Sequence, residues 1–277
     1  MRIHALATVA LLLGGCAATG DVALEGRDFV VQQNAIPASA QATGTEEITR
    51  LVHGSGPAYV TLVVSEIDTQ NVTNRRDSGH DVPVTSGSGF LVDGSGYVMT
   101  AAHVAVSKGY SVSARAANGR VYSGKVIDIY PANDMALIKL RGYAGKAVPP
   151  AGSQCVAKGS MVYSLGKPHA QGDTARIGRL ESMHFGRPVR YGKFGYPDAM
   201  VLRMSTQKGE SGGPLFNEQG ELVGMVVSTL SDANGKPINL AHAVPASNLA
   251  RFMCAHLTCS GNWATLAQSS TASCPQI

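Results

Sequence analysis

A chain of 277 residues in which 44% of residues are apolar can bury a large core, which excludes a wholly disordered protein. The chain has 32 glycines and only 15% charged residues, and this composition favours short strands joined by tight turns over a helical bundle. Lys and Arg residues are scattered, and the net charge is only +4, so nothing indicates a nucleic-acid partner.

The N-terminal segment predicts an export signal. Arg2 supplies a positive charge, a short apolar run follows, and small residues precede Cys16, as a signal peptidase requires. The sequence Leu13-Gly14-Gly15-Cys16 resembles the cleavage box of bacterial lipoproteins, in which the cysteine becomes the lipidated N-terminus. We expect residues 1–15 to be a lipoprotein-type signal peptide, and Cys16 to anchor the exported protein to a membrane of the bacterial cell envelope, facing the periplasm. The alternative is an ordinary signal peptide with an incidental cysteine.

Four further cysteines remain after Cys16. In an oxidising compartment they can form disulfides, and three pairings of four cysteines are possible. Proximity in sequence favours Cys254 with Cys259, which leaves Cys155 for Cys274. Metal binding is the alternative, but the cysteines and histidines lack the paired spacing of a structural zinc site. We therefore expect no metal.

Residues 16–57 are rich in Ala, Gln, Thr and Gly with little periodicity, and they predict a linker or arm. The folded body is expected to begin near residue 58. Residues 68–85 predict a loop, and an Asp-Gly-Ser-Gly turn at 93–96 predicts a hairpin. The strands of a first small barrel, at about 58–145, are expected at 59–64, 87–92, 97–100, 111–116, 120–129 and 135–140.

A passage rich in Gly and Pro at 141–152 separates this unit from a second barrel, at about 152–244. Pro245 then begins a predicted helix over 246–257, whose apolar residues recur at helical spacing. Residues 258–277 are expected to form a short tail. The strands of the second barrel are expected at 161–165, 176–183, 199–204, 222–227 and 238–244.

Three local motifs carry residues that nucleophilic acyl transfer needs. Thr100-Ala101-Ala102-His103 places an imidazole just after a strand, where it can act as a general base. Asp134 lies immediately before an apolar strand, where a buried carboxylate could fix the tautomer of His103. Taken singly, either residue could be purely structural.

The third motif, Gly209-Glu210-Ser211-Gly212-Gly213-Pro214-Leu215, is more specific. Glycines around a serine permit a tight backbone that turns two N–H groups towards one point, where an oxyanion can be held. The motif predicts Ser211 as the nucleophile, with the N–H groups of Gly209 and Ser211 as the oxyanion hole. The conjunction of the three motifs in the order His, Asp, Ser favours the catalytic interpretation.

These motifs resemble those of the trypsin/chymotrypsin-fold serine proteases, and more narrowly those of the bacterial HtrA-like branch. The narrower resemblance rests on Gly87-Ser88-Gly89-Phe90-Leu91-Val92, on Asn133-Asp134-Met135-Ala136 and on Ala243-Val244-Pro245. It covers about residues 59–257, and 58–257 is expected to be the protease domain. It implies a mostly β fold of two six-stranded antiparallel barrels with a C-terminal helix, and a serine endopeptidase acting on polypeptides without a cofactor.

Two features depart from the family pattern. HtrA-like enzymes usually carry a peptide-binding PDZ domain after the protease domain, and too few residues follow Leu257 for one. The family often has Asn or Asp where this chain has Glu210, which is expected to contribute its backbone to the loop and to repel acidic substrate groups. Relatives are often trimers, and the sequence leaves monomer or trimer open.

The resemblance also implies a substrate pocket near Ser205, with Val227, Ser228 and Thr229 in its wall. No acidic residue occupies its base, so a small or medium apolar side chain is expected rather than Lys or Arg. His242 lies in the same region. It could contact an acidic side chain of the substrate or simply pack in the core.

Two other functions compete with this prediction. A catalytically silent relative could use the same groove to hold peptides, although a complete triad argues against that role. An esterase would use the same acyl chemistry, but the sequence lacks the nucleophile elbow of dedicated esterases.

Overall fold

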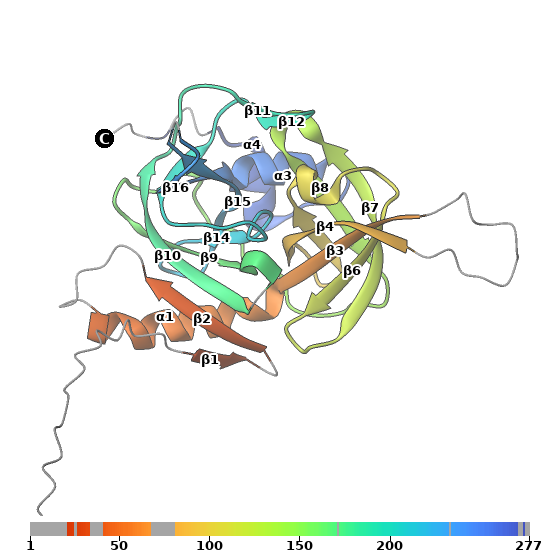
Figure 1. The fold of residues 1–277 in the computed structure, drawn as a ribbon, viewed down its shortest axis with the longest axis horizontal. Coiled ribbons are helices and arrows are strands. Elements are labelled where there is room, and N and C mark those ends of the chain that lie inside the picture. The colour runs from red at the N-terminus through yellow and green to blue at the C-terminus, as the bar shows by residue number, and fades with distance from the viewer. Residues whose placement is uncertain are drawn as a thin grey trace, which may run out of the picture.

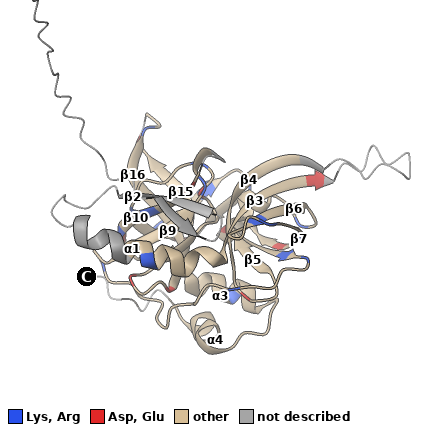
Figure 2. Ribbon diagram, turned by 90° about the horizontal axis from the view of Figure 1, so that it is seen from below, with Lys and Arg blue, Asp and Glu red and all other residues tan. Residues whose placement is uncertain are grey.

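The structure is a computed structural model that describes residues 21–24, 27–33, 41–67, 81–170, 172–232, 234–270 and 274. Two β-barrels dominate the fold, and helices α3 and α4 pack on them (Figure 1). Lys and Arg are spread over elements of both barrels (Figure 2). Cys16 and the predicted signal peptide lie outside the described residues.

The first barrel is closed in the order β3-β4-β5-β8-β7-β6, with every neighbouring pair antiparallel. Side chains that point alternately inward and outward along the strands build its core. On β6, Val112, Ala114 and Ala116 are buried, while the residues between them are more exposed. Its strands are β3 (Tyr59–Ile67), β4 (Asp81–Leu91), β5 (Tyr97–Thr100), β6 (Ser111–Ala116), β7 (Val121–Tyr130) and β8 (Met135–Leu140).

The second barrel has the strand order β10-β13-β16-β15-β14-β9. It is closed because β9, the last strand of this order, also pairs with β10, the first. The predicted fold class is therefore confirmed. Sequence periodicity missed β14, which is only three residues long and begins within the glycine-rich motif. The strands are β9 (Met161–Gly166), β10 (Asp173–Ser182), β13 (Met200–Arg203), β14 (Pro214–Phe216), β15 (Leu222–Ser231) and β16 (Pro237–Pro245).

A separate two-stranded hairpin, β11 (Val189–Tyr191) with β12 (Phe194–Tyr196), was also missed. After the second barrel, Pro245 caps α3 (Ala246–Cys254), which is shorter than the predicted helix. Within the expected tail the chain forms a further helix, α4 (Gly261–Gln268).

The segment expected to be a linker contains β1 (Asp21–Leu24), β2 (Arg27–Gln33) and α1 (Gln41–Ser55), so the structure differs from that expectation. Strand β13 pairs only with the second half of β10, and β2 pairs in parallel with Asp173–Ile177 in the first half. This pairing satisfies backbone groups that would otherwise form an open strand edge. In α1, Ile48 and Val52 lie four residues apart and are buried.

Both predicted cysteine pairs are disulfides. Cys155 is joined to Cys274, with Cα atoms 5.3 Å apart, and Cys254 to Cys259, with Cα atoms 5.4 Å apart. The first bond ties the C-terminal tail to the start of the second barrel, and the second closes a short loop between α3 and α4.

Candidate active site

His103 lies on a single helical turn, α2 (Ala102–Ala105), directly after β5. Ala101 and Ala102 are fully buried, and their small side chains let the turn lie close against the barrel. The imidazole remains 26% exposed. The sequence thus places a titratable ring at the rim of the first barrel, where solvent and a ligand can both reach it.

Asp134 follows a short 3-10 helix, η3 (Pro131–Asn133), and adopts a left-handed conformation with φ 49° before β8 begins. Asp tolerates this region better than most residues. Its side chain is fully buried. Oδ1 accepts the backbone N–H of His103 at 2.9 Å, and Oδ2 lies 2.8 Å from His103 Nδ1. A carboxylate at this position keeps the proton on Nδ1 and leaves Nε2 as the basic nitrogen.

A third donor to this carboxylate comes from the β11–β12 hairpin: the Tyr191 hydroxyl donates to Asp134 Oδ2. Burial and the nearby charge of Asp134 raise the pKa of Tyr191 far above its usual range, so the hydroxyl keeps its proton. Tyr191 and Phe194 also meet the His103 ring edge to face, with centroids 5.7 and 6.4 Å away. Sequence reasoning missed this contact, and its only local signal is an aromatic-rich segment between two strands.

Ser211 lies on the loop between β13 and β14. Gly212 has φ +83°, and a Cβ there would come within 2.3 Å of the Ser88 carbonyl oxygen and of Thr100 Oγ1. Ser211 and His103 line one cavity of about 470 Å³ between the two barrels. The Ser211 hydroxyl donates to the Val227 carbonyl oxygen at 3.3 Å. Hydrogen bonds between catalytic residues are often long in the absence of substrate. A rotation about the Ser211 χ1 angle would turn this hydroxyl away from the Val227 carbonyl oxygen.

Gly209 lines the same cavity and adopts φ +99°, a conformation that favours glycine. A Cβ there would also lie 2.3 Å from the Lys167 carbonyl oxygen. The backbone N–H groups of Gly209 and Ser211 find no acceptor among the residues that the structure describes. These two unsatisfied N–H donors lie on either side of Glu210 in the chain and beside the Ser211 hydroxyl. Together they form a site where a negatively charged oxygen can bind.

The predicted pocket residues lie mainly on two adjacent strands. Val227, Ser228 and Thr229 are on β15, and Ser228 pairs in register with His242 on β16. Ser205 follows β13 and is half-buried. Tyr196 joins two of them, because its hydroxyl lies 2.7 Å from Ser228 Oγ and 2.8 Å from His242 Nδ1.

His242 is only 1% exposed and packs against Phe185, with ring centroids 4.3 Å apart. Burial lowers the pKa of His242 to about 4, so the ring is neutral at neutral pH. Of the two roles that the sequence left open, packing fits this environment.

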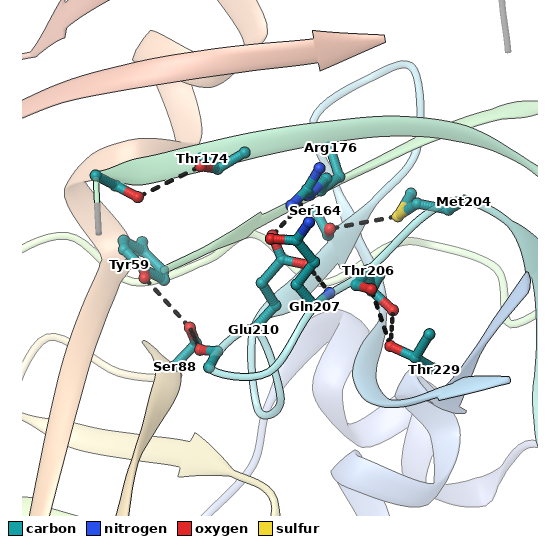
Figure 3. A network of polar contacts seen from close by, with 12 residues as sticks. Tyr59, Ser88, Ser164, Thr174, Arg176, Met204, Thr206, Gln207, Glu210 and Thr229 are labelled. Carbon is teal, nitrogen blue, oxygen red and sulfur yellow. Dashed lines mark hydrogen bonds and ion pairs between the residues drawn. The ribbon is translucent and has the colours of Figure 1, made fainter. Parts of the chain in front are cut away.

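The environment of Glu210 differs from the expectation that its side chain repels acidic substrate groups. Its side chain is 2% exposed and receives a hydrogen bond from Arg176 Nε at 2.7 Å, so it faces the interior of the second barrel (Figure 3). Burial raises the pKa of the Glu210 carboxyl, and the adjacent Arg176 guanidinium opposes that shift. The prediction that Glu210 repels acidic substrate groups is wrong, because its charge is buried and paired.

The part of the chain covered by the structure contains no cluster of three or more His, Cys, Asp or Glu side chains that could hold a metal ion. None of its helices is both long enough and apolar enough to cross a membrane.

Two six-stranded antiparallel barrels with His, Asp and Ser motifs gathered between them define the architecture of the chymotrypsin-like peptidases. Residues 87–225 match the family described as the trypsin-like peptidase domain, and the chain belongs to that family. The matched region contains all three motifs.

The chain is 32% identical over 176 residues to a probable periplasmic serine endoprotease, DegP-like, of Brucella suis; the match covers 63% of this chain and 33% of that protein. It is 30% identical over 237 residues to the putative serine protease HhoA of a Synechocystis species, covering 75% and 58%. The chain thus spans about a third of the DegP-like relative, and the resemblance to the HtrA-like branch is confirmed.

Two solved structures share the fold. The Rv3671c protease in its inactive form aligns with a TM-score of 0.60 at 20% identity, covering 81% of this chain and 98% of that one. The HtrA-type protease AlgW, solved with a tripeptide, gives the same TM-score and identity, covering 74% and 62%.

Proposed function

We propose that the chain is a serine endopeptidase in which His103, Asp134 and Ser211 form the catalytic triad. The observation that carries this proposal is the buried Asp134 carboxylate, which bonds both the backbone and the ring of His103 beside the cavity that Ser211 lines. A merely structural Asp–His pair would not require a serine hydroxyl and two free N–H donors at the same cavity.

The mechanism follows from these positions. His103 Nε2 takes the proton of Ser211 while Oγ attacks the carbonyl carbon of a peptide bond. The N–H groups of Gly209 and Ser211 hold the resulting oxyanion. The protonated His103 then gives its proton to the leaving amine, and an acyl-enzyme forms. Water, deprotonated by His103, then attacks the acyl carbon, the bond to Oγ breaks, and His103 returns its proton to Oγ, which releases the acid product and restores Ser211. Asp134 stabilises the imidazolium throughout.

Polypeptides are the proposed substrates. The cavity at Ser211 is open to solvent and partly apolar, and Val63 and Val84 in its wall are 40% and 43% exposed. An extended chain could cover these side chains. The proposed preference for a small or medium apolar side chain rests on the absence of an acidic residue from the predicted pocket, where the Thr229 hydroxyl is 2.7 Å from that of Thr206.

The proposed location is the bacterial cell envelope, with Cys16 as the lipid anchor. The lipoprotein box supports this proposal, as do the two disulfides and the periplasmic description of the DegP-like relative. Membrane fractionation of cells expressing the wild type and Cys16→Ser tests it. Wild-type protein in the soluble fraction would contradict a lipid anchor.

The activity is tested by reacting the purified protein with a fluorophosphonate probe and by digesting an unfolded protein. Labelling and cleavage that both disappear in Ser211→Ala would support the proposal, and the sequences of the cut sites would define the pocket. Binding of peptides without labelling or cleavage would instead support a catalytically silent protein.

A further inference from the structure

A cavity of about 410 Å³, which we call the α3 cavity, lies where helix α3 packs against the first barrel (Figure 1). From the helix it is lined by Asn248, Arg251 and Phe252, which are spaced three and four residues apart and so share one face. Its volume is typical of sites that bind small molecules. None of these three residues belongs to the proposed triad, the oxyanion hole or the predicted pocket, so the proposed chemistry does not account for the cavity.

The first barrel supplies the apolar part of the α3 cavity. Met135 and Phe252 are only 2% and 9% exposed and form its floor, whereas Tyr130 is 46% exposed and forms a wall. The rings of Tyr130 and Phe252 lie nearly parallel, with centroids 6.3 Å apart. In the described part of the chain, Tyr130 is the only aromatic residue among the large apolar side chains that are exposed. Tyrosines are enriched at interfaces because they offer a large apolar ring and a polar tip.

The charge at the rim of the α3 cavity is positive. Arg251 is exposed and donates to Asn248 Oδ1, and it makes no ion pair with a carboxylate of the described residues. The cavity lining itself contains no Asp or Glu. Asp128, a carboxylate that contacts the chain just after α3, is paired with His256 at 3.2 Å and with Lys108 at 3.6 Å. An incoming carboxylate would therefore meet an uncompensated positive charge at Arg251.

The α3 cavity is continuous with the surface around the proposed active site. Tyr130 and Asn133 also line a neighbouring cavity of about 490 Å³ beside the β11–β12 hairpin. That cavity is lined by Phe194, whose ring meets His103, and by two cations, Arg190 and Lys193, again with no acidic residue. A chain held at Ser211 could thus extend over the hairpin to α3.

We propose that the α3 cavity binds a segment of the polypeptide substrate away from the scissile bond, and that it selects segments carrying an aromatic or large apolar residue beside a carboxylate. The apolar side chain covers Tyr130 and Met135, and the carboxylate pairs with Arg251. The inference rests on the proposed function and names the class of polypeptide that the proposed enzyme takes. Selection by the α3 cavity adds to any preference of the pocket at Ser211.

Binding without cleavage tests the α3 cavity directly. In the Ser211→Ala background, fluorescence anisotropy measures the Kd of a short labelled peptide rich in Phe and Glu, and of a matched peptide with Gln in place of Glu. The Glu peptide should bind at least about threefold more tightly. Its Kd should rise about threefold in Arg251→Gln and at least about fivefold in Tyr130→Ala, because an exposed ion pair contributes less than a buried aromatic contact. Arg251→Gln should also bind the two peptides equally.

Arg120→Gln and Val121→Ala are the matched controls. Both residues are exposed, lie on the first barrel and line neither cavity, so their replacement should leave both Kd values unchanged. Circular dichroism establishes that each variant is folded. If Tyr130→Ala does not fold, Arg251→Gln decides the question. Equal binding of the two peptides in the Ser211→Ala background, or an unchanged Kd in either folded cavity variant, would overturn the inference.

Cleavage by the active protein provides a second readout. Two pairs of substrates share one cleaved bond, and each pair carries the Glu-containing or the Gln-containing segment on one side of it or on the other. In one pair, the Glu segment should lower KM at least about threefold with kcat unchanged, because distant contacts add uniform binding. Arg251→Gln should remove that difference. Equal KM values within both pairs would overturn the inference and leave the proposed function standing. If the wild type cleaves no substrate, the proposed function is contradicted, and the binding measurements still decide whether the cavity takes acidic segments.

Discussion

Asp134 shows how a buried charge can be satisfied by three donors. Its carboxylate accepts the His103 backbone N–H, faces the His103 ring and accepts the Tyr191 hydroxyl, all without exposure to solvent. A buried carboxylate is tolerated only when such hydrogen bonds compensate for lost hydration. The proposed role of Asp134 therefore depends partly on Tyr191, a residue outside the triad.

Replacing Tyr191 with Phe should lower kcat/KM on a peptide substrate by roughly tenfold, because a hydrogen bond to a charged group contributes about 1.5–3 kcal/mol. Steady-state kinetics would measure the loss. Tyr163→Phe is the matched control. It removes another buried hydroxyl, bonded to Ser55 and Leu51, from a place away from the triad. Equal activity losses in the two variants would contradict a specific role for Tyr191.

His242 makes the stability of the protein dependent on pH. Its folded pKa is about 4, below the usual value of 6.5, so the unfolded chain binds a proton at a pH where the folded chain does not. The stabilisation is complete above pH 6.5 and is lost as pH falls towards 4, by up to about 3 kcal/mol. Urea denaturation should show a smaller decline over this range in His242→Gln. The exposed His53→Gln variant should keep the full decline, and identical declines in all three proteins would contradict the prediction.

At the scale of elements, the β11–β12 hairpin has an influence that its length does not suggest. It forms its own two-stranded sheet and is not hydrogen-bonded as a strand to either barrel. Yet Tyr191 reaches the proposed triad, Phe194 contacts the His103 ring, and Tyr196 bonds to the predicted pocket. The hairpin therefore connects two parts of the site that belong to different barrels.

Replacing Val189–Tyr196 with a short Gly-Ser linker should leave both barrels folded, because no barrel strand loses its partner. Labelling by the fluorophosphonate probe should fall at least as far as in Tyr191→Phe. A cooperative thermal transition by circular dichroism would establish folding. Full labelling of a folded variant would show that the hairpin does not support the site.

On the scale of the whole molecule, the two disulfides constrain the chain to very different extents. Cys155–Cys274 spans 119 residues and links the start of the second barrel to the C-terminal tail, whereas Cys254–Cys259 spans 5. In the chain-entropy account, a cross-link stabilises by restricting the unfolded chain, and a longer loop gives the larger effect.

Replacing both cysteines of the longer loop with Ser should lower the free energy of unfolding by about 4–5 kcal/mol, and replacing both of the shorter loop by about 2 kcal/mol. Urea denaturation of the two double variants measures the difference. The short-loop variant serves as the control for loss of a disulfide as such. A larger loss from the short loop would contradict the entropic argument.

The sequence by itself determined the features that local signals encode. Runs of strand-forming residues and an Asp-Gly turn predicted the strands of the first barrel and all strands of the second except β14, and Pro245 predicted the start of α3. The motifs around His103, Asp134 and Ser211 identified the candidate triad, because the three occur together in the order His, Asp, Ser. The roles of these three residues remain predictions until they are tested.

Only the tertiary structure decided which distant residues support that site. Tyr191 bonds to Asp134 across 57 positions, and Glu210 pairs with Arg176 across 34. The pairing of β2 with β10 is likewise non-local. No periodicity marks such contacts, because each depends on how two folded elements meet in space. The physical reason is that backbone propensity is local, whereas the burial and neutralisation of a charge depend on the assembled core.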